Sequence, residues 1–124
     1  MFFLKKLIII LLSYLILAGN MITTSHLTPD NDIVLGRNIY NDRCKVCHGE
    51  QGDGKTFSAN VLMPPPKNFT AKNTKEKLTR SRMIHAITHG QPNTAMMAWE
   101  KVLNEQEIYS VVSYIRKELM KLND

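Results

Sequence analysis

The chain has 124 residues, enough for one domain but near the lower limit of what buries a hydrophobic core unaided. Lysine and arginine (16) outnumber aspartate and glutamate (11), giving a formal net charge of +5, which falls to +3 without the N-terminal Lys5 and Lys6. The length predicts a single domain. No basic stretch is interleaved with aromatic residues, which argues against a nucleic-acid-binding protein.

The first 25 residues have the layout of an export signal. The chain begins with a short basic region that ends in Lys5 and Lys6. The largely apolar run Leu7 to Ala18 follows it, and a polar stretch follows that run. This run is shorter than the ~20 residues that span a bilayer comfortably, although its apolar character extends to Ile22. We expect residues 1–25 to be either a cleaved signal peptide or an uncleaved anchor, and residues 26–124 to be the folded domain.

A first helix is predicted from about Asp30 to Arg43. Asp30 and Asp32 favour its positive N-terminal end, and apolar residues recur near the helical period after them. Gly36 interrupts the pattern, and a glycine inside a helix costs ~1 kcal/mol relative to alanine. We therefore expect another helix to approach closely at Gly36.

The pentapeptide Cys44-Lys45-Val46-Cys47-His48 follows this helix. Two thiols one helical turn apart can add to the two vinyl groups of a porphyrin, and the adjacent histidine can then supply a nitrogen to the iron. The motif predicts one covalently attached haem c, held by Cys44 and Cys47, with His48 as an axial iron ligand. Covalent haem is installed outside the cytoplasm, so the motif and the export signal together predict a periplasmic bacterial protein.

Three other interpretations of the two cysteines are weaker. A zinc site needs about four ligands, and no second thiol pair accompanies His26, His85 or His89. A thioredoxin-like redox motif follows a strand, which the sequence before Cys44 does not indicate. A disulfide across so short a segment would restrain little of the chain.

Residues 49–74 hold three glycines and the run Pro64-Pro65-Pro66, so this segment is predicted to be irregular. Loops of this length are uncommon in compact domains unless they serve a function, and wrapping a flat apolar cofactor is one. The overlapping segment Lys67 to Arg82 carries six basic residues against Glu76 alone. It is either an ordinary solvated segment or a docking patch for an acidic redox partner.

Two further helices are predicted. The first runs from Thr79 to His89 and stops at Gly90. The second begins at Asn104, which forms a capping-box pattern with Glu107. Apolar residues then recur every three or four positions: Ile108, Val111, Val112, Ile115, Leu119 and Leu122. No segment resembles a strand, so the predicted fold is all-α, with about three main helices and long loops around one haem.

The loop between these two helices carries Met96 and Met97, whereas Met83 and Met120 fall on helix faces, where core packing is expected. A methionine delivered by a loop from the far half of the chain suits a thioether ligand on the opposite face of the haem. The residues alone leave the choice between Met96 and Met97 open.

The haem pentapeptide, the glycine–proline loop, the stretch Gly90-x-x-x-Thr94-Ala95-Met96-x-Ala98-Trp99 and the last helix together resemble small class I c-type cytochromes. The similarity is to single-haem bacterial domains such as those of cbb3-type oxidase subunits, and it covers about residues 30–120. Aligning on Ala98-Trp99 implies that Met96 is the second axial ligand. Met97 occupies the place where the family has proline and is the alternative ligand.

The same resemblance implies supporting contacts. A carbonyl near Pro65 or Pro66 would accept the other ring N–H of His48, and Trp99 would either plug the core or bind a haem propionate. Gly36 and Tyr40 of the first helix would cross the last helix near Tyr114 and Ile115.

The predicted function is an exported mono-haem electron carrier in a respiratory-type chain, not an enzyme. The alternatives are an electron-transfer subunit of an oxidase or dehydrogenase complex, and a haem gas sensor or enzyme with an open sixth position at the iron. Fold alone does not name the electron donor or acceptor.

Overall fold

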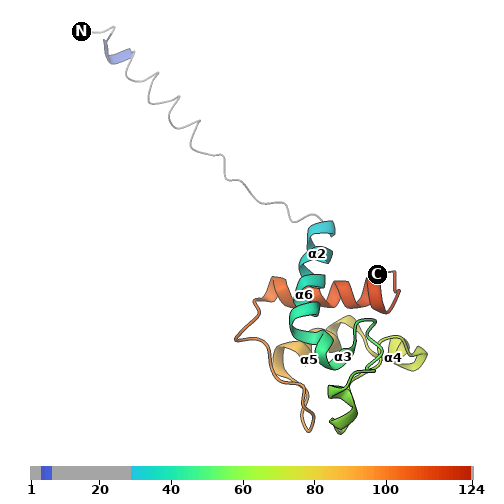
Figure 1. Ribbon diagram of the computed structural model, residues 1–124. Coiled ribbons are helices and arrows are strands. Elements are labelled where there is room, and N and C mark those ends of the chain that lie inside the picture. The colour runs from blue at the N-terminus through green and yellow to red at the C-terminus, as the bar shows by residue number, and fades with distance from the viewer. Residues whose placement is uncertain (1–3, 7–28, 124) are drawn as a thin grey trace.

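The computed structural model describes residues 4–6 and 29–123 (Figure 1). Every regular element between residues 29 and 123 is helical, as predicted. The chain forms α2 (Pro29–Ile39), the π-helical turn η1 (Tyr40–Cys44), α3 (Lys45–His48), the 3₁₀ turn η2 (Ser58–Val61), α4 (Lys72–Lys77), α5 (Arg80–His89), α6 (Glu105–Tyr114) and the π-helical turn η3 (Ile115–Leu119).

Most of the predicted export segment 1–25, together with His26, lies outside the described residues. Among the residues that are described, no helix has the length and apolar character needed to cross a membrane.

The crossing of α2 over α6 forms the centre of the core (Figure 1). Gly36 makes it possible, because a Cβ at this position would overlap the backbone carbonyl of Ser110 and lie 2.9 Å from Tyr114 Cβ. One turn later the fully buried Tyr40 ring packs against Tyr114, with ring centroids 5.5 Å apart. The predicted close approach at Gly36 and the predicted tyrosine pair are both confirmed.

Helix α5 packs against α6 through the buried side chains of Met83 and Ile87. It begins at Arg80, one residue later than predicted, because the Thr79 side chain caps it by accepting a hydrogen bond from the Arg82 N–H. Its end is as predicted, because Gly90 follows its last residue with a φ of 74°. A positive φ of this kind favours glycine, so the helix stops there.

Helix α6 begins with the predicted capping box. The Asn104 side chain accepts from the Glu107 N–H at 3.0 Å, and the Glu107 carboxylate accepts from the Asn104 N–H at 2.8 Å. Leu103, directly before the cap, and Ile108, four residues after it, are both buried.

Other features of the fold also differ from the prediction. The α-helix α2 ends at Ile39, before the predicted Arg43, and helical structure continues through η1 and α3 to His48. The last helix changes to π geometry at Ile115 and ends at Leu119 instead of reaching Leu122. The short helix α4 occupies part of the segment expected to be irregular; it has no buried residue and no side-chain cap, so neither an apolar stripe nor a capping residue marked it in the sequence.

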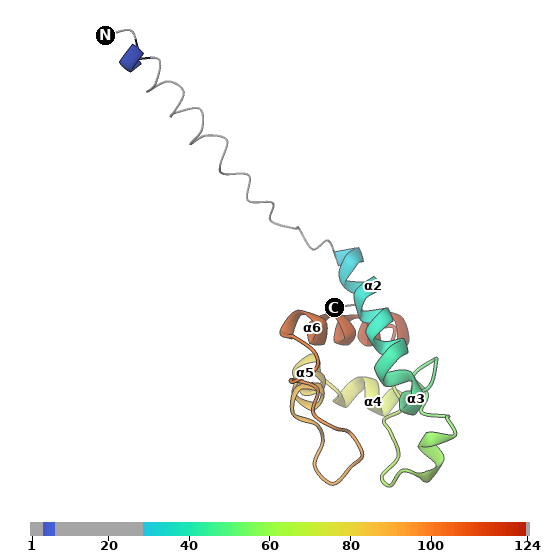
Figure 2. The same ribbon diagram turned by 60° about the vertical axis from the view of Figure 1, so that its left-hand side comes forward.

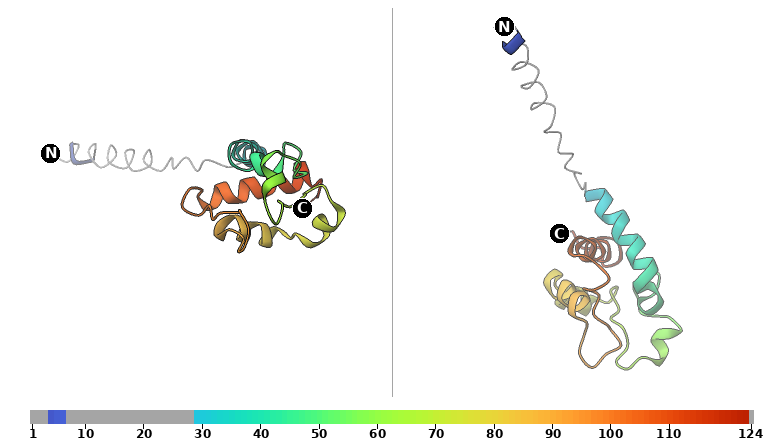
Figure 3. Two further views of the ribbon diagram at one scale, coloured as in Figure 1. Left: turned by 60° about the horizontal axis from the view of Figure 1, so that its bottom comes forward. Right: turned by 90° about the vertical axis from the view of Figure 1, so that its left-hand side faces the viewer.

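Two irregular segments lie side by side at the end of the molecule opposite α6 (Figures 2 and 3). One is residues 49–71, which includes η2, and the other is residues 90–99, between α5 and α6. We call this region the loop end, in contrast to the helix crossing formed by α2 and α6.

Candidate haem site

The two cysteines and His48 share a single helical region. Cys44 is the last residue of η1, and Cys47 and His48 close α3. Both cysteines are free thiols and all three residues are half-buried. The helix ends directly after His48 because Gly49 adopts a φ of 84°. The Tyr40 hydroxyl donates a buried 2.7 Å hydrogen bond to the Gly49 carbonyl and fixes this end to the core.

The ring of His48 is oriented by two contacts. Its Nδ1 lies 3.2 Å from the Lys67 carbonyl oxygen, and its face stacks on Phe69 with centroids 4.7 Å and planes 11° apart. A histidine that donates from Nδ1 to a carbonyl keeps the lone pair on Nε2 for a metal. The accepting carbonyl belongs to Lys67, the residue directly after Pro66, where the resemblance implied a carbonyl near Pro65 or Pro66.

Two backbone hydrogen bonds bring the Lys67 carbonyl and Phe69 back to the helix. Gly54 N–H donates to the His48 carbonyl at 2.8 Å, and Phe69 N–H donates to the Gly52 carbonyl at 2.7 Å. A Cβ on Gly52 would lie 2.9 Å from the Phe69 ring. Residues 49–71 therefore fold back on α3 and do not extend into solvent.

Burial sets the protonation of the unliganded residues. It lowers the pKa of His48, and the hydrogen bond to the Lys67 carbonyl opposes this only in part. Burial, and secondarily the neighbouring Cys47, raises the pKa of Cys44 to about 12. At neutral pH the imidazole of His48 is therefore neutral, as a metal ligand must be, and Cys44 is a protonated thiol.

The segment 90–99 positions Met96 through a small hydrogen-bond network. The Met96 N–H donates a hydrogen bond to the Thr94 hydroxyl at 3.0 Å. The Thr94 hydroxyl in turn donates to the Gln91 carbonyl at 2.8 Å. The Gln91 N–H donates a 3.0 Å hydrogen bond to the Met96 carbonyl. Met96 is half-buried and packs against the core, whereas Met97 is 57% exposed. The two neighbouring methionines thus have different environments.

Trp99 closes this segment against α5. Its backbone N–H donates to the Ile87 carbonyl at 2.9 Å, and its half-buried side chain packs against the hydrophobic core. This packing corresponds to one of the two roles expected for Trp99, a core plug; the other, binding a haem propionate, stays a prediction.

The described residues fit a haem by their donor set and by their exposed apolar surface. Imidazole and thioether are ligands that haem iron takes in c-type cytochromes. Five of the nine large apolar side chains exposed in the described part of the chain lie in the pentapeptide or at the loop end: Val46, Phe57, Val61, Met63 and Met97. Exposed apolar side chains at one end of a molecule are covered when a ligand or partner binds there, and a flat apolar cofactor would do so here.

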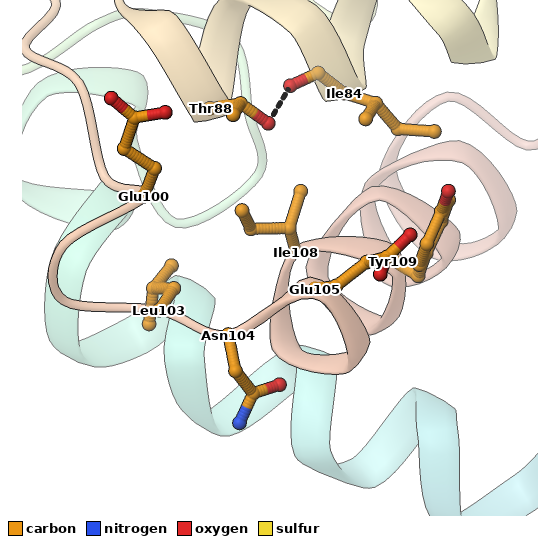
Figure 4. Close-up of a pocket in the computed structure, with 8 residues that line it drawn as sticks. All are labelled: Ile84, Thr88, Glu100, Leu103, Asn104, Glu105, Ile108 and Tyr109. Atoms are coloured by element: carbon orange, nitrogen blue, oxygen red, sulfur yellow. Dashed lines mark hydrogen bonds between the residues drawn. The ribbon is translucent and has the colours of Figure 1, made fainter.

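Other kinds of site are less well supported. Across residues 4–6 and 29–123, no three histidine, cysteine, aspartate or glutamate side chains gather as a metal site. A separate hollow of about 320 Å³ lies between α5 and the start of α6 (Figure 4), but no cysteine, histidine or methionine lines it. The side chains expected for haem binding lie elsewhere.

The stacking of Phe69 on His48 was not predicted from the sequence. Phe69 is the only large apolar residue between Lys67 and Lys77, and this isolation was the available signal. The Lys67 carbonyl had no such signal, because a backbone acceptor is the same at every residue.

Comparison with known proteins agrees with the motif and the fold. Residues 31–115 match the family described as cytochrome c oxidase, cbb3-type, subunit III. The cbb3-type cytochrome c oxidase subunit CcoP of Azospirillum brasilense is 28% identical over 80 residues, covering 64% of this chain and 26% of that protein. CcoP of Azospirillum sp. (strain B510) is 27% identical over 85 residues, covering 67% and 27%. The chain spans about a quarter of the length of these relatives.

Two solved structures are similar in fold. A chain of the Kuenenia stuttgartiensis reducing HAO-like protein complex superposes with a TM-score of 0.57 and 29% identity, over 67% of this chain and 40% of that one. The c-type cytochrome KustC0563 superposes with a TM-score of 0.55 and 27% identity, over 65% and 93%. The chain thus belongs to the family of cbb3-type cytochrome c oxidase subunit III, and residues 31–115 form its cytochrome c domain.

Proposed function

We propose that this protein is a mono-haem electron carrier in which Cys44 and Cys47 attach the haem and His48 and Met96 ligate its iron. The observation that carries the proposal is the contact between His48 Nδ1 and the Lys67 carbonyl. It leaves Nε2 as the free nitrogen, on the histidine that directly follows two thiols at haem-vinyl spacing. Haem iron supplies reversible one-electron exchange.

The surrounding residues have defined tasks in this proposal. The Lys67 carbonyl raises the basicity of His48, and the Phe69 ring restricts its rotation. The hydrogen bonds around Thr94 hold Met96 in place to close the sixth position. Methionine–histidine ligation favours a higher reduction potential than two histidines. A haem iron whose two axial positions are both filled by protein ligands transfers electrons and has no free position at which to activate a substrate.

We infer that the carrier works on the periplasmic side of a bacterial membrane and exchanges electrons with an acidic partner. The structure divides the basic segment 67–82 into two parts. Lys67, Lys72 and Lys77 are exposed, whereas Arg80 donates to the Ser113 hydroxyl at 3.0 Å and contributes to the α5–α6 packing. Because the carbonyl of Lys67 contacts His48, a partner docked on the exposed lysines would lie close to the iron ligand.

A second candidate is a dedicated subunit of a larger redox assembly. The relatives from Azospirillum are named as oxidase subunits, and one structural relative belongs to a protein complex. Blue native electrophoresis of detergent-solubilised membranes, stained for haem, separates the two: a free carrier migrates alone, whereas a subunit comigrates with a complex.

Two measurements test the proposed function. The intact mass of denatured protein, made in a host with haem-maturation machinery, should include the haem; loss of the haem on denaturation would refute covalent attachment. Carbon monoxide added to the reduced protein should leave the spectrum unchanged. Rapid stoichiometric binding would instead indicate an open sixth position and a gas sensor or enzyme.

A further inference from the structure

Two histidines outside the haem site lie together on the surface of α5. His85 and His89 are four residues apart, so they share one face of the helix. Both are exposed, and their ring centroids are 4.8 Å apart. Neither belongs to the pentapeptide or to the segment 90–99, and the haem site proposed above assigns them no role.

Glu100 joins this pair from a different segment. Its Oε2 lies 3.3 Å from His89 Nδ1, and its N–H donates to the Thr88 carbonyl at 3.3 Å. Figure 4 shows Glu100 beside Thr88, at the end of α5. The carboxylate is therefore held next to the last turn of the helix by the backbone.

The 3.3 Å separation between His89 Nδ1 and Glu100 Oε2 suits a hydrogen bond from that nitrogen to the carboxylate. A carboxylate that accepts the Nδ1 proton fixes the tautomer with a free lone pair on Nε2 and raises the basicity of that nitrogen. Histidines spaced i and i+4 on one helix face are able to bind a single metal ion together. Two nitrogens each ~2.1 Å from a tetrahedral ion are about 3.4 Å apart, a separation that rings 4.8 Å apart reach by side-chain rotation.

We propose that His85 and His89 form a surface site for a divalent transition-metal ion of the zinc, copper or nickel class. Imidazole nitrogens suit these ions, whereas magnesium and calcium prefer oxygen ligands. His85 and His89 supply two nitrogens and water completes the coordination. Glu100 is a positioning residue that acts through His89, in keeping with the lack of a three-ligand cluster in the described ranges 4–6 and 29–123.

The site also connects the two ends of the segment that carries Met96. His89 directly precedes Gly90, and Glu100 directly follows Trp99. A metal ion bound to His89 would keep the Nδ1 proton of that residue directed at Glu100. It would therefore stabilise the contact that holds the two ends of residues 90–99 together. Metal binding should slow hydrogen exchange at the Gln91 and Trp99 amides, which donate to the Met96 and Ile87 carbonyls.

Zinc titration of the full-length holoprotein, produced without a polyhistidine tag and followed by calorimetry, tests the proposal. We expect one zinc ion per chain and a loss of affinity of tenfold or more in both His85→Ala and His89→Ala. Glu100→Gln should weaken binding by roughly 10–100-fold, the usual effect of removing such an outer carboxylate. Glu105→Gln, at an exposed carboxylate nearby, should leave the affinity unchanged.

The controls separate this site from the other histidines. Binding that disappears in His26→Ala, or that persists unchanged in either His85→Ala or His89→Ala, overturns the proposal. Unchanged affinity in Glu100→Gln overturns the role given to that residue. Neither result depends on the haem ligands, since zinc affinity is read independently of electron transfer.

Discussion

At the helix crossing, large side chains are fully enclosed by protein, whereas the loop end leaves several of its largest apolar side chains in solvent. Tyr40, Val111 and Val112 have no exposed surface. Phe57 and Met63 at the loop end are 89% and 87% exposed. The backbone differs in the same sense, because α2 and α6 make the most extensive contact between helices, while the loop end relies on scattered turns.

The difference indicates which part of the fold is complete without a cofactor. Burial of apolar area drives folding, and the helix crossing obtains it from protein alone. The loop end buries Ala59 and Phe69 against protein, whereas its exposed apolar side chains would be covered only by another apolar body. We therefore expect substitutions at the crossing to act on stability, and substitutions at the loop end to act on haem ligation and electron transfer.

Gly36→Ala is the strongest test of the helix crossing. The added methyl group would overlap the Ser110 carbonyl, which is backbone and cannot rotate away. Overpacking of this kind costs about 3 kcal/mol, and urea unfolding of the holoprotein measures it. Val34→Ala, at an exposed position of the same helix, should change the free energy of unfolding by less than about 0.5 kcal/mol. Equal effects of the two substitutions would contradict the packing argument.

Met96→Leu tests the loop end. Exchanging methionine for a similar apolar volume costs at most about 1.5 kcal/mol, but it removes the proposed thioether ligand. The near-infrared thioether–iron band of the ferric protein should disappear, and the reduced protein should bind carbon monoxide. Met97→Leu should retain the band and stay closed to carbon monoxide; the opposite result would transfer the ligand role to Met97.

Asn104→Ala separates capping from packing within the helical part. It removes the side-chain acceptor for the Glu107 N–H, and loss of such a cap costs ~1 kcal/mol. Thermal or urea unfolding should show this loss with no change in the haem spectrum. Asn104→Ser, which keeps an acceptor oxygen, should lie within a few tenths of a kcal/mol of the native protein.

Reversing charge in the basic segment should have the smallest effect on stability. Lys72→Glu combined with Lys77→Glu changes two exposed side chains, so the free energy of unfolding should shift by less than about 0.5 kcal/mol. The association rate with an acidic redox partner should fall roughly tenfold at low salt, and the difference should shrink as salt rises. Lys101→Glu, at an exposed lysine outside the segment, is the control. A rate insensitive to salt and to both changes would make the segment an ordinary solvated one.

Local chemistry explains why much of the helical framework was predictable. Asn104 with Glu107, and Thr79 with Gly90, mark helix ends by interactions within a few residues. Gly36 stood out because glycine is unfavourable inside a helix. Helix α4 was not predictable in this way, since its residues are mostly polar and Ala71 before it offers no side-chain cap. Its position depends on the rest of the fold.

The candidate site was predictable only in part for a related reason. The pentapeptide is a local pattern, so Cys44, Cys47 and His48 were evident from spacing, and their roles remain a prediction. The partner of His48 is a backbone carbonyl 19 residues away, which no side-chain pattern encodes. Likewise, nothing in the sequence indicated that Arg80 contacts Ser113 on α6 while nearby lysines are exposed.

The turn Tyr40–Cys44 contains one residue more than a regular helical turn would hold. Each residue advances a helix by about 100°, so this insertion shifts the angular phase between the part that buries Gly36 and Tyr40 and the part that presents the thiols and His48. A designer who grafts the pentapeptide onto an ideal straight helix after α2 would reproduce every side chain and still aim the thiols in a different direction. A graft of the motif must therefore include the π-helical turn Tyr40–Cys44 with its additional residue.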